Sequence, residues 1–139
     1  MLRYKYRGKE KTIGWVYGSL LCFGANEYAI HLRNAEGSLI VDPETVGQLW
    51  ATKDNTKFYE GDIISFGISG RLICVLIYNE INKCFSFIEK SEYNKLQTAD
   101  ELLRLNILSN LSYAKVEMIK ALLGNIHDNP ELLTKIEKK

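Results

Sequence analysis

The stretch RLICVLIY over residues 71–78 decides the fold, together with the loop NEINK over 79–83 and the run CFSFI over 84–88. Both runs are rich in β-branched and aromatic residues, which favour strands over helices. The polar loop between them has a length that is common in β-hairpins. The pattern therefore predicts two antiparallel strands that are joined by a short turn.

Similar short runs precede this hairpin along the first two-thirds of the chain. They are separated by turn residues and cover residues 13–23, 28–32, 38–41 and 62–66. No helical pattern lies between them, so a small barrel-like or sandwich core of short antiparallel strands is expected. We predict a mainly β protein with a strand-rich core over about residues 1–90 and one or two accessory helices in the C-terminal third.

A helical pattern begins near residue 97. Residues 98–101 (TADE) have the form of a capping box, in which the Thr and Glu side chains satisfy exposed backbone donors. Apolar side chains then recur at helical spacing: Leu102, Leu103, Ile107 and Leu111. The pattern predicts a helix over about residues 99–110.

Two further elements are expected towards the C-terminus. Residues 112–123 fit either a helix that ends at Gly124 or a strand over about 115–121, and periodicity does not decide between them. Asn129, Pro130 and Glu131 form a helix-start pattern, with Asn as N-cap, Pro at the first helical position and Glu near the positive end of the helix dipole. We predict a short C-terminal helix over about 130–138.

Length and charge limit the classes of function. The chain has 139 residues and a formal net charge of +1, with 18 Lys+Arg against 17 Asp+Glu. This length suits a single domain over 1–139, with any internal boundary near 90–98. Near-neutrality argues against a dedicated duplex-DNA binder. The longest apolar run, 72–78, is too short to span a bilayer, so we expect no membrane partner.

The three cysteines, Cys22, Cys74 and Cys84, are widely spaced and form no CxxC motif. This arrangement predicts neither a disulfide framework nor a zinc site. Each cysteine lies in an apolar run, where we expect it to be a small buried hydrophobe. This usage suits a reducing cytosol.

Two acidic clusters suggest either a carboxylate site or turn chemistry. As a site, they would serve a metal-assisted hydrolase through Asp42, Glu44, Glu60 and Asp62. As turns, Asp42 bonds to backbone N–H groups, Pro43 fixes φ, and Glu60 with Gly61 starts a strand. No recognisable nucleophile accompanies the acids, so the turn interpretation is favoured, and no catalytic residue, metal or cofactor is expected.

Cations alternate with aromatic rings near the N-terminus. Such a pattern suits single-stranded nucleic acid, and the candidate residues are Arg3, Lys5, Arg7, Trp15 and Tyr17. The alternative is an edge strand whose Tyr4 and Tyr6 share a packed face while the cations stay in solvent. The near-neutral charge favours the edge strand, and nucleic-acid binding stays as the alternative function.

The two histidines stand outside any recognisable catalytic pattern. His31 lies mid-strand and is expected to be structural, while His127 beside Asp128 is expected to form a local hydrogen-bonded pair. The GxGxxG, P-loop, HExxH and GxSxG motifs are absent from the sequence. We therefore expect no enzymatic activity.

Five ordered motifs resemble those of the YopX family of small phage- and prophage-encoded proteins. They are YKYRGK over 4–9, GWVYGSL over 14–20, VDPETVGQ over 41–48, YEGDII over 59–64 and GNIHDNPELL over 124–133. The residues within them that we expect to be structural are Asp42, Pro43, Glu44, Gln48, Tyr59, Glu60, Gly61, Asp62, Asn129 and Pro130.

The resemblance implies a strand-rich domain with accessory helices, a strand over about 115–121 and a tendency to form homo-oligomers. It also implies a phage or prophage role in the cytoplasm of a bacterial host, with no catalytic assignment. Residues 49–58 depart from the family pattern, since position 51 is Ala instead of Gly and the turn is shorter. If that loop binds something in relatives, the binding need not carry over to this chain.

The residues of the predicted 99–110 helix also favour self-association. Its apolar side chains exceed what one helix needs for packing: Leu102, Leu103, Ile107, Leu108 and Leu111. The basic N-terminal strand and the acidic turns further suit contacts between copies of the chain. We expect a non-enzymatic domain that associates with itself, and the sequence does not identify any other protein partner.

Overall fold

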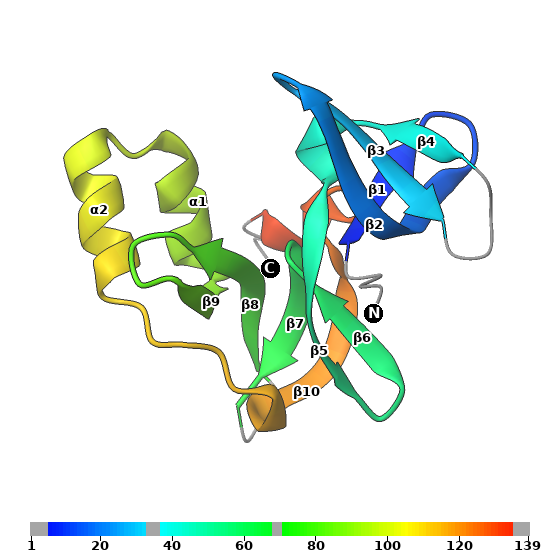
Figure 1. The fold of residues 1–139 in the computed structure, drawn as a ribbon. Coiled ribbons are helices and arrows are strands. Elements are labelled where there is room, and N and C mark those ends of the chain that lie inside the picture. The colour runs from blue at the N-terminus through cyan, green and yellow to red at the C-terminus, as the bar shows by residue number, and fades with distance from the viewer. Residues whose placement is uncertain (1–5, 33–36, 68–70, 135–139) are drawn as a thin grey trace. The chain divides into compact units, whose positions relative to one another are not determined.

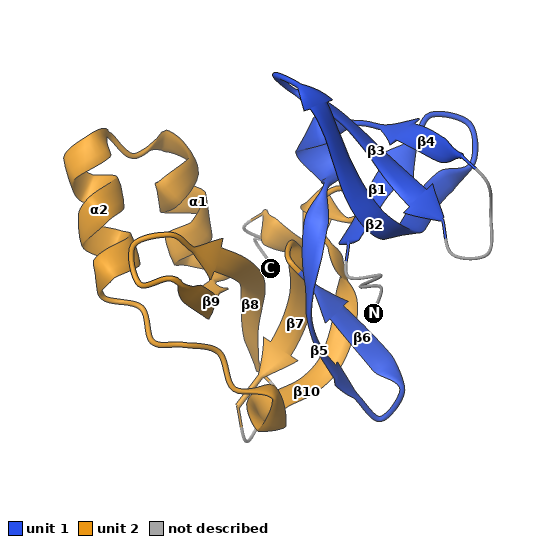
Figure 2. Ribbon diagram, viewed as in Figure 1, with its two compact units in different colours: residues 1–59 blue, residues 60–139 orange. Residues whose placement is uncertain are grey.

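The computed structural model describes residues 6–32, 37–67 and 71–134 (Figure 1). The chain divides into two compact units, unit 1 over residues 1–59 and unit 2 over residues 60–139 (Figure 2). Each unit is built on one antiparallel sheet, with six strands in the first and four in the second. The mainly β prediction is therefore confirmed, and the units divide well before residues 90–98.

Unit 1 has a sheet in the order β4-β3-β2-β1-β5-β6. Its elements are β1 (Tyr6–Glu10), β2 (Gly14–Gly24), β3 (Glu27–Leu32), β4 (Ser38–Val41), the 3-10 helix η1 (Pro43–Thr45), β5 (Gly47–Lys53) and β6 (Thr56–Tyr59). β1 lies inside the sheet, because β2 pairs along one side of it and β5 pairs with Tyr6 and Arg7. The edge-strand prediction is therefore wrong, since local alternation does not report the long-range pairing with β5.

The core of unit 1 forms around Val16, Ile30 and Val41, which are all buried. Gly8 lies beside Val41, and a Cβ on this glycine would come within 2.8 Å of a Val41 methyl group. The backbone N–H of Asp42 donates to the carbonyl oxygen of Lys9 at 2.9 Å. Glycine at position 8 therefore lets the end of β4 return to β1.

Residues 49–58, which depart from the YopX pattern, form the β5–β6 hairpin. Asp54 and Asn55 both have positive φ, 52° and 68°, as a two-residue hairpin turn of the favoured kind requires. Ala51 lies within β5 opposite Phe58, so this position needs no glycine. The altered sequence still builds a hairpin, with a register shift between Leu49 and Ala51.

Unit 2 has a sheet in the order β10-β7-β8-β9. Its strands are β7 (Asp62–Phe66), β8 (Leu72–Asn79), β9 (Cys84–Glu89) and β10 (Ile119–Asn125). The β8–β9 hairpin that the stretch 71–88 predicts is confirmed, with Asn79 opposite Cys84. The fully buried Asn79 side chain accepts a hydrogen bond from the N–H of Ile81 at 3.0 Å and donates to the carbonyl oxygen of Leu108 at 2.7 Å. It thus joins the hairpin loop to the second helix.

Two α-helices, α1 (Lys90–Thr98) and α2 (Glu101–Ser109), pack against the sheet of unit 2 (Figure 1). The buried core that they share with the strands consists of Ile63, Val75, Ile88, Leu96, Ile107, Leu108 and Leu133. α2 corresponds to the helix predicted over 99–110, but its N-cap is Asp100, whose Oδ1 accepts from the N–H of Leu103 at 2.8 Å. Thr98 instead ends α1, and its hydroxyl donates to the carbonyl oxygen of Lys95 at 3.4 Å.

Residues 112–123 contain a strand, and not a continued helix. A 3-10 turn, η2 (Val116–Met118), leads into β10, which pairs antiparallel with β7. A second 3-10 turn, η3 (Pro130–Leu133), is followed by extended Thr134, so the helix predicted over 130–138 does not form up to that residue, and 135–139 lie outside the described chain. Asn129 does not cap η3, because its Oδ1 accepts from the backbone N–H of Asn125 at 3.1 Å.

Candidate functional site

Of the predicted nucleic-acid residues, Arg7, Trp15 and Tyr17 are described, and they form a stack of rings and cations in unit 1 with Lys9 and Tyr59. The β1–β2 register places Arg7 opposite Tyr17 and Lys9 opposite Trp15. The Arg7 Cζ lies 4.5 Å from the centre of the Trp15 ring and 4.8 Å from the centre of the Tyr59 ring. The Lys9 Nζ lies 5.7 Å from the same Trp15 ring. These distances are typical of cation–π contacts.

Burial decides what this stack can do. Arg7 is only 6% exposed, so its guanidinium group cannot meet a phosphate unless the stack opens. Tyr17 is exposed and its ring centre lies 5.6 Å from that of Tyr59. Arg3 and Lys5 lie outside the described residues. The arrangement therefore supports a structural role for Arg7, and it leaves Tyr17 as the accessible ring.

The first acidic cluster is a turn, as the favoured interpretation predicts. Asp42 is the N-cap of η1, and its Oδ1 accepts from the backbone N–H of Glu44 at 3.1 Å. Pro43 occupies the first position of η1, and Thr45 donates its N–H to the Asp42 carbonyl oxygen at 3.0 Å. Gln48 follows in β5, opposite Tyr6 of β1. These motif residues hold the connection between β4 and β5.

The second acidic cluster starts β7. Gly61 has a φ of 95°, its N–H donates to the Leu76 carbonyl oxygen at 2.7 Å, and its own carbonyl oxygen accepts from Ile126 at 2.9 Å. Asp62 is buried and lies opposite Asn125 of β10. The Glu60–Gly61 turn therefore fixes three strands of unit 2 at one point.

The carboxylates do not build a metal centre in the part of the chain that the structure describes. Asp42 and Glu44 belong to unit 1, whereas Glu60 and Asp62 belong to unit 2. Within residues 6–32, 37–67 and 71–134, no group of three or more His, Cys, Asp or Glu side chains could hold a metal ion. The convergence that a metal-assisted hydrolase requires is therefore not found there.

The cysteines differ in environment. Cys22 is exposed, so the prediction that it is buried is wrong: it lies near the turn of the β2–β3 hairpin, beyond the core of unit 1. Cys74 is buried, and this burial, followed by the nearby Glu89 carboxylate, raises the pKa of its thiol to about 11. Cys84 is half-buried, with its Sγ 3.9 Å from the Ser86 hydroxyl.

The histidines have local hydrogen-bond partners. The Nδ1 of His31 lies 3.3 Å from the Ser38 hydroxyl, across the β3–β4 pair. The backbone N–H of His127 donates to the Asn125 Oδ1 at 2.9 Å in the turn that follows β10. The side chain of Asn125 also donates to the Asp128 carboxylate at 3.2 Å. Both histidines thus lie in hydrogen-bonded turns or strand pairs.

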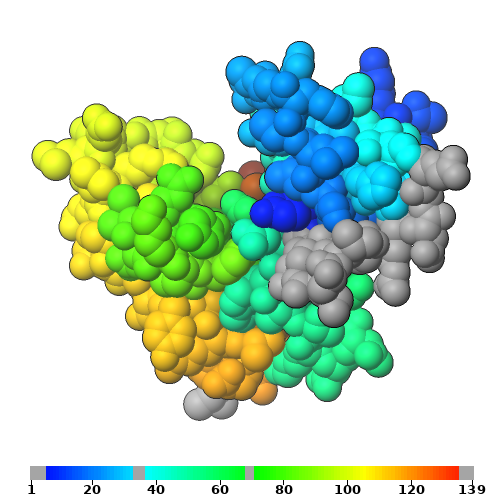
Figure 3. Space-filling model, in the orientation of Figure 1, coloured from blue at the N-terminus to red at the C-terminus, as the bar shows by residue number. Residues whose placement is uncertain are grey.

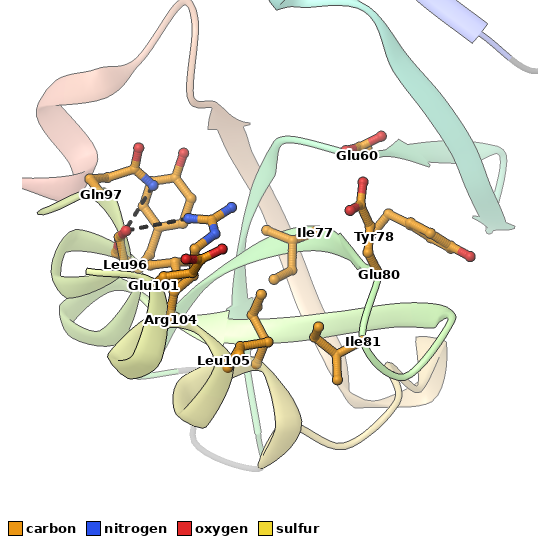
Figure 4. A pocket seen from close by; sticks show the side chains of 12 residues that line it. Glu60, Ile77, Tyr78, Glu80, Ile81, Leu96, Gln97, Glu101, Arg104 and Leu105 are labelled. Atoms are coloured by element: carbon orange, nitrogen blue, oxygen red, sulfur yellow. Dashed lines mark hydrogen bonds between the residues drawn. The ribbon is translucent and has the colours of Figure 1, made fainter. Parts of the chain in front are cut away.

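A cavity of about 440 Å³ lies in unit 2 between the β8–β9 hairpin and the two helices (Figure 4). Its apolar walls come from both sides and include Ile77, Ile81, Tyr93, Leu96, Leu105 and Leu108. Three carboxylates also line it: Glu60, Glu80 and Glu101. Among the described residues that line it, Arg104 is the one cation, and its Nη1 donates to the Leu96 carbonyl oxygen at 3.5 Å. Within this lining Leu96 and Leu108 are buried, whereas Glu80 and Glu101 are exposed and form an acidic rim.

A shallower groove of about 660 Å³ follows the outer face of α2, which Figure 3 shows at the surface in yellow. Leu102 is 78% exposed, Leu103 44% and Leu105 45%. Ile81 and Leu105 line both this groove and the cavity. The groove therefore carries an apolar face that no described residue covers.

Sequence reasoning found the groove in part and missed the cavity. The surplus of apolar residues over 99–110 is real, although Ile107 and Leu108 are used in the core. The cavity combines residues 60, 77–81, 93–97 and 101–108, which no single motif contains. Of the residues that line the cavity, only Glu101 belongs to a motif that the sequence analysis used, the capping box. Glu80 lines the same cavity because of the tertiary fold, and no local pattern predicts this.

Two further findings bear on function. Within the described residues, no helix is both long enough and apolar enough to cross a membrane. A scan against protein-family models, a search of curated proteins and a search of solved structures each returned no match.

Proposed function

We propose that this chain is a non-enzymatic protein-interaction module that associates with a second copy of itself through the outer face of α2. The observation that carries the proposal is the exposure of Leu102, Leu103 and Leu105 on one helix. Burying one such side chain contributes about 1.5–3 kcal/mol. A face of this kind favours association because a partner removes it from water.

The composition of the groove supports a second copy as the partner. Polar side chains, Asp100, Asn106 and Ser109, lie beside the leucines and would form a hydrated rim. A two-fold axis brings the same face of both copies together, so the leucines would meet each other. The net charge of +1 opposes this approach only weakly.

The ordered motifs that resemble the YopX family extend the proposal to a phage or prophage setting in a bacterial cytoplasm. This part of the proposal rests on the resemblance alone. Residues 49–58 still pair as a hairpin, with one register shift, so the departure from the family pattern does not remove the local fold.

Single-stranded nucleic acid is the weaker alternative. Its support is the exposed ring of Tyr17 and the contact of Lys9 with the Trp15 ring, while the burial of Arg7 counts against it. A titration with single-stranded oligonucleotides across salt concentrations separates the two functions, because phosphate contacts make binding strongly salt-dependent. Association without such binding supports the interaction module.

The test uses light scattering at micromolar concentration on the full chain and two variants. The wild-type chain is expected to be a dimer or a higher oligomer, and Leu102→Lys is expected to be a monomer. Ile40→Lys is the control, because Ile40 is 72% exposed but lies in unit 1. A monomeric wild-type chain, or an equal effect of both variants, would contradict the proposal.

A further inference from the structure

We propose that the cavity of unit 2 binds an organic cation, namely an ammonium or guanidinium group on an aliphatic stem. The inference does not depend on self-association, because it rests on the cavity between the β8–β9 hairpin and the helices. This cavity, at about 440 Å³, is within the usual size range of small-molecule sites.

The walls of the cavity select an apolar stem. Ile77 from β8, Leu96 from α1 and Leu108 from α2 face it, and Leu96 and Leu108 belong to the buried core. Because these side chains are held by core packing, the apolar interior is formed before any ligand arrives. An aliphatic chain placed there gains the contacts that water cannot make.

The rim selects a positive head group. Glu80 lies in the β8–β9 loop and Glu101 in the first turn of α2, and both are exposed. Neither has an ion pair with another described residue. Figure 4 shows Glu101 on the helical side and Glu80 on the strand side, with Ile77 between them. A cation between the two carboxylates would be attracted by both.

The remaining charged and aromatic groups agree with this choice. Arg104 is turned towards the Leu96 carbonyl oxygen, and one guanidinium does not offset the carboxylates of the rim. Tyr93 also lines the cavity and offers a ring for cation–π contact, whereas the Tyr78 ring packs against Phe85 with ring centres 5.3 Å apart. An anionic ligand of the same shape would meet repulsion from the rim.

The test is an NMR titration of the labelled full chain with three probes of one shape: n-hexylammonium, n-hexanol and n-hexanoate. We expect hexylammonium to shift the amide signals of residues 77–81 and 93–105 and to bind more tightly than hexanol, with hexanoate weakest. Equal binding of hexylammonium and hexanoate at these amides, or no shift there with hexylammonium, would overturn the proposal.

Variants then assign the effect to the rim. Glu80→Gln combined with Glu101→Gln is expected to weaken hexylammonium about fivefold or more. The matched control is Glu117→Gln combined with Glu131→Gln, which removes the same charge from exposed positions of unit 2 outside the cavity. Loss of affinity in both double variants alike, or in neither, would also overturn the proposal.

Two further titrations identify the source of the cation and separate its binding from self-association. A blocked Gly-Arg-Gly peptide that binds more tightly than hexylammonium identifies an arginine side chain of a partner as the source of the cation, and the reverse order identifies a free amine. Repeating the titration in the Leu102→Lys variant separates this site from self-association. Cation binding that persists in that variant supports the cavity even where the α2 interface fails.

Discussion

The cation–aromatic stack of unit 1 and the cavity of unit 2 place their charges in opposite settings. Arg7 is buried, and its guanidinium group contacts the Trp15 and Tyr59 rings within the same unit. Glu80 and Glu101 stand exposed at the rim of an apolar hollow, where their charges are open to a ligand. The alternation that drew attention to Arg7 therefore marks a structural feature, whereas Glu80 and Glu101, which the sequence did not suggest as site residues, line the candidate site.

The largest expected loss of stability comes from a substitution that breaks the cation–aromatic stack. Arg7→Ala removes a desolvated cation from two rings and leaves a gap, so we expect the free energy of unfolding to fall by about 2–3 kcal/mol. Urea denaturation followed by tryptophan fluorescence measures this change. Lys9→Ala is the control and should cost less than about 1 kcal/mol, because Lys9 is only half-buried and contacts one ring at 5.7 Å. Equal costs would remove the structural role assigned to Arg7.

The next effect concerns the support of the cavity. Asn79→Ala should lower the free energy of unfolding by about 1–3 kcal/mol, since the buried Leu108 carbonyl oxygen loses the amide donor at 2.7 Å. The same urea experiment measures it. Asn82→Ala is a suitable comparison, because the exposed Asn82 side chain donates to the Leu111 carbonyl oxygen at 3.0 Å and reaches the Leu108 carbonyl oxygen only at 3.5 Å. A larger loss from Asn82→Ala would contradict the role of Asn79 as the link to α2.

A smaller loss of stability tests the start of α2, which the sequence-based prediction placed at the wrong residue. Asp100→Ala should cost about 1 kcal/mol, because the backbone N–H of Leu103 loses its capping carboxylate. Thr98→Ala should cost less, since Thr98 ends α1 and its hydroxyl bonds at 3.4 Å. If Thr98→Ala were the more damaging change, the capping box over 98–101 would be the correct description after all.

The raised pKa of the Cys74 thiol predicts a loss of stability under alkaline conditions. The folded chain holds the pKa of the Cys74 thiol at about 11, above its ordinary 9.0, so it favours the neutral thiol. The contribution of the neutral Cys74 thiol to the free energy of unfolding is therefore complete below pH 9. This contribution is lost as the pH rises towards 11, because the thiol ionises more readily in the unfolded chain. Cys74→Ala should flatten the fall in unfolding free energy over this range, whereas Cys22→Ala, at an exposed position, should leave it unchanged.

The success of sequence reasoning follows the range of the interactions. The β8–β9 hairpin was predictable because its strands and turn are adjacent in the chain. The interior position of β1 depends on β5, about forty residues away, and no local pattern contains it. α1 escaped detection because, of its nine residues, only Tyr93 and Leu96 pack on the core.

The same principle explains the candidate site. The leucines of α2 follow one another along one helix, so their surplus could be seen in the sequence. Glu80 and Glu101 line one cavity because the β8–β9 loop is joined to the end of α2, most closely through Asn79. That contact is a buried hydrogen bond between residues 79 and 108, and it has no signature in composition or spacing.

The most direct test of the central claim is an isotope-filtered NOE experiment on an equal mixture of carbon-13-labelled and unlabelled chains. Self-association through α2 predicts intermolecular NOEs at the methyl groups of Leu102 and Leu103, and none at Ile40 of unit 1. An associated chain whose intermolecular NOEs arise at Ile40 and leave the α2 leucines silent would contradict it.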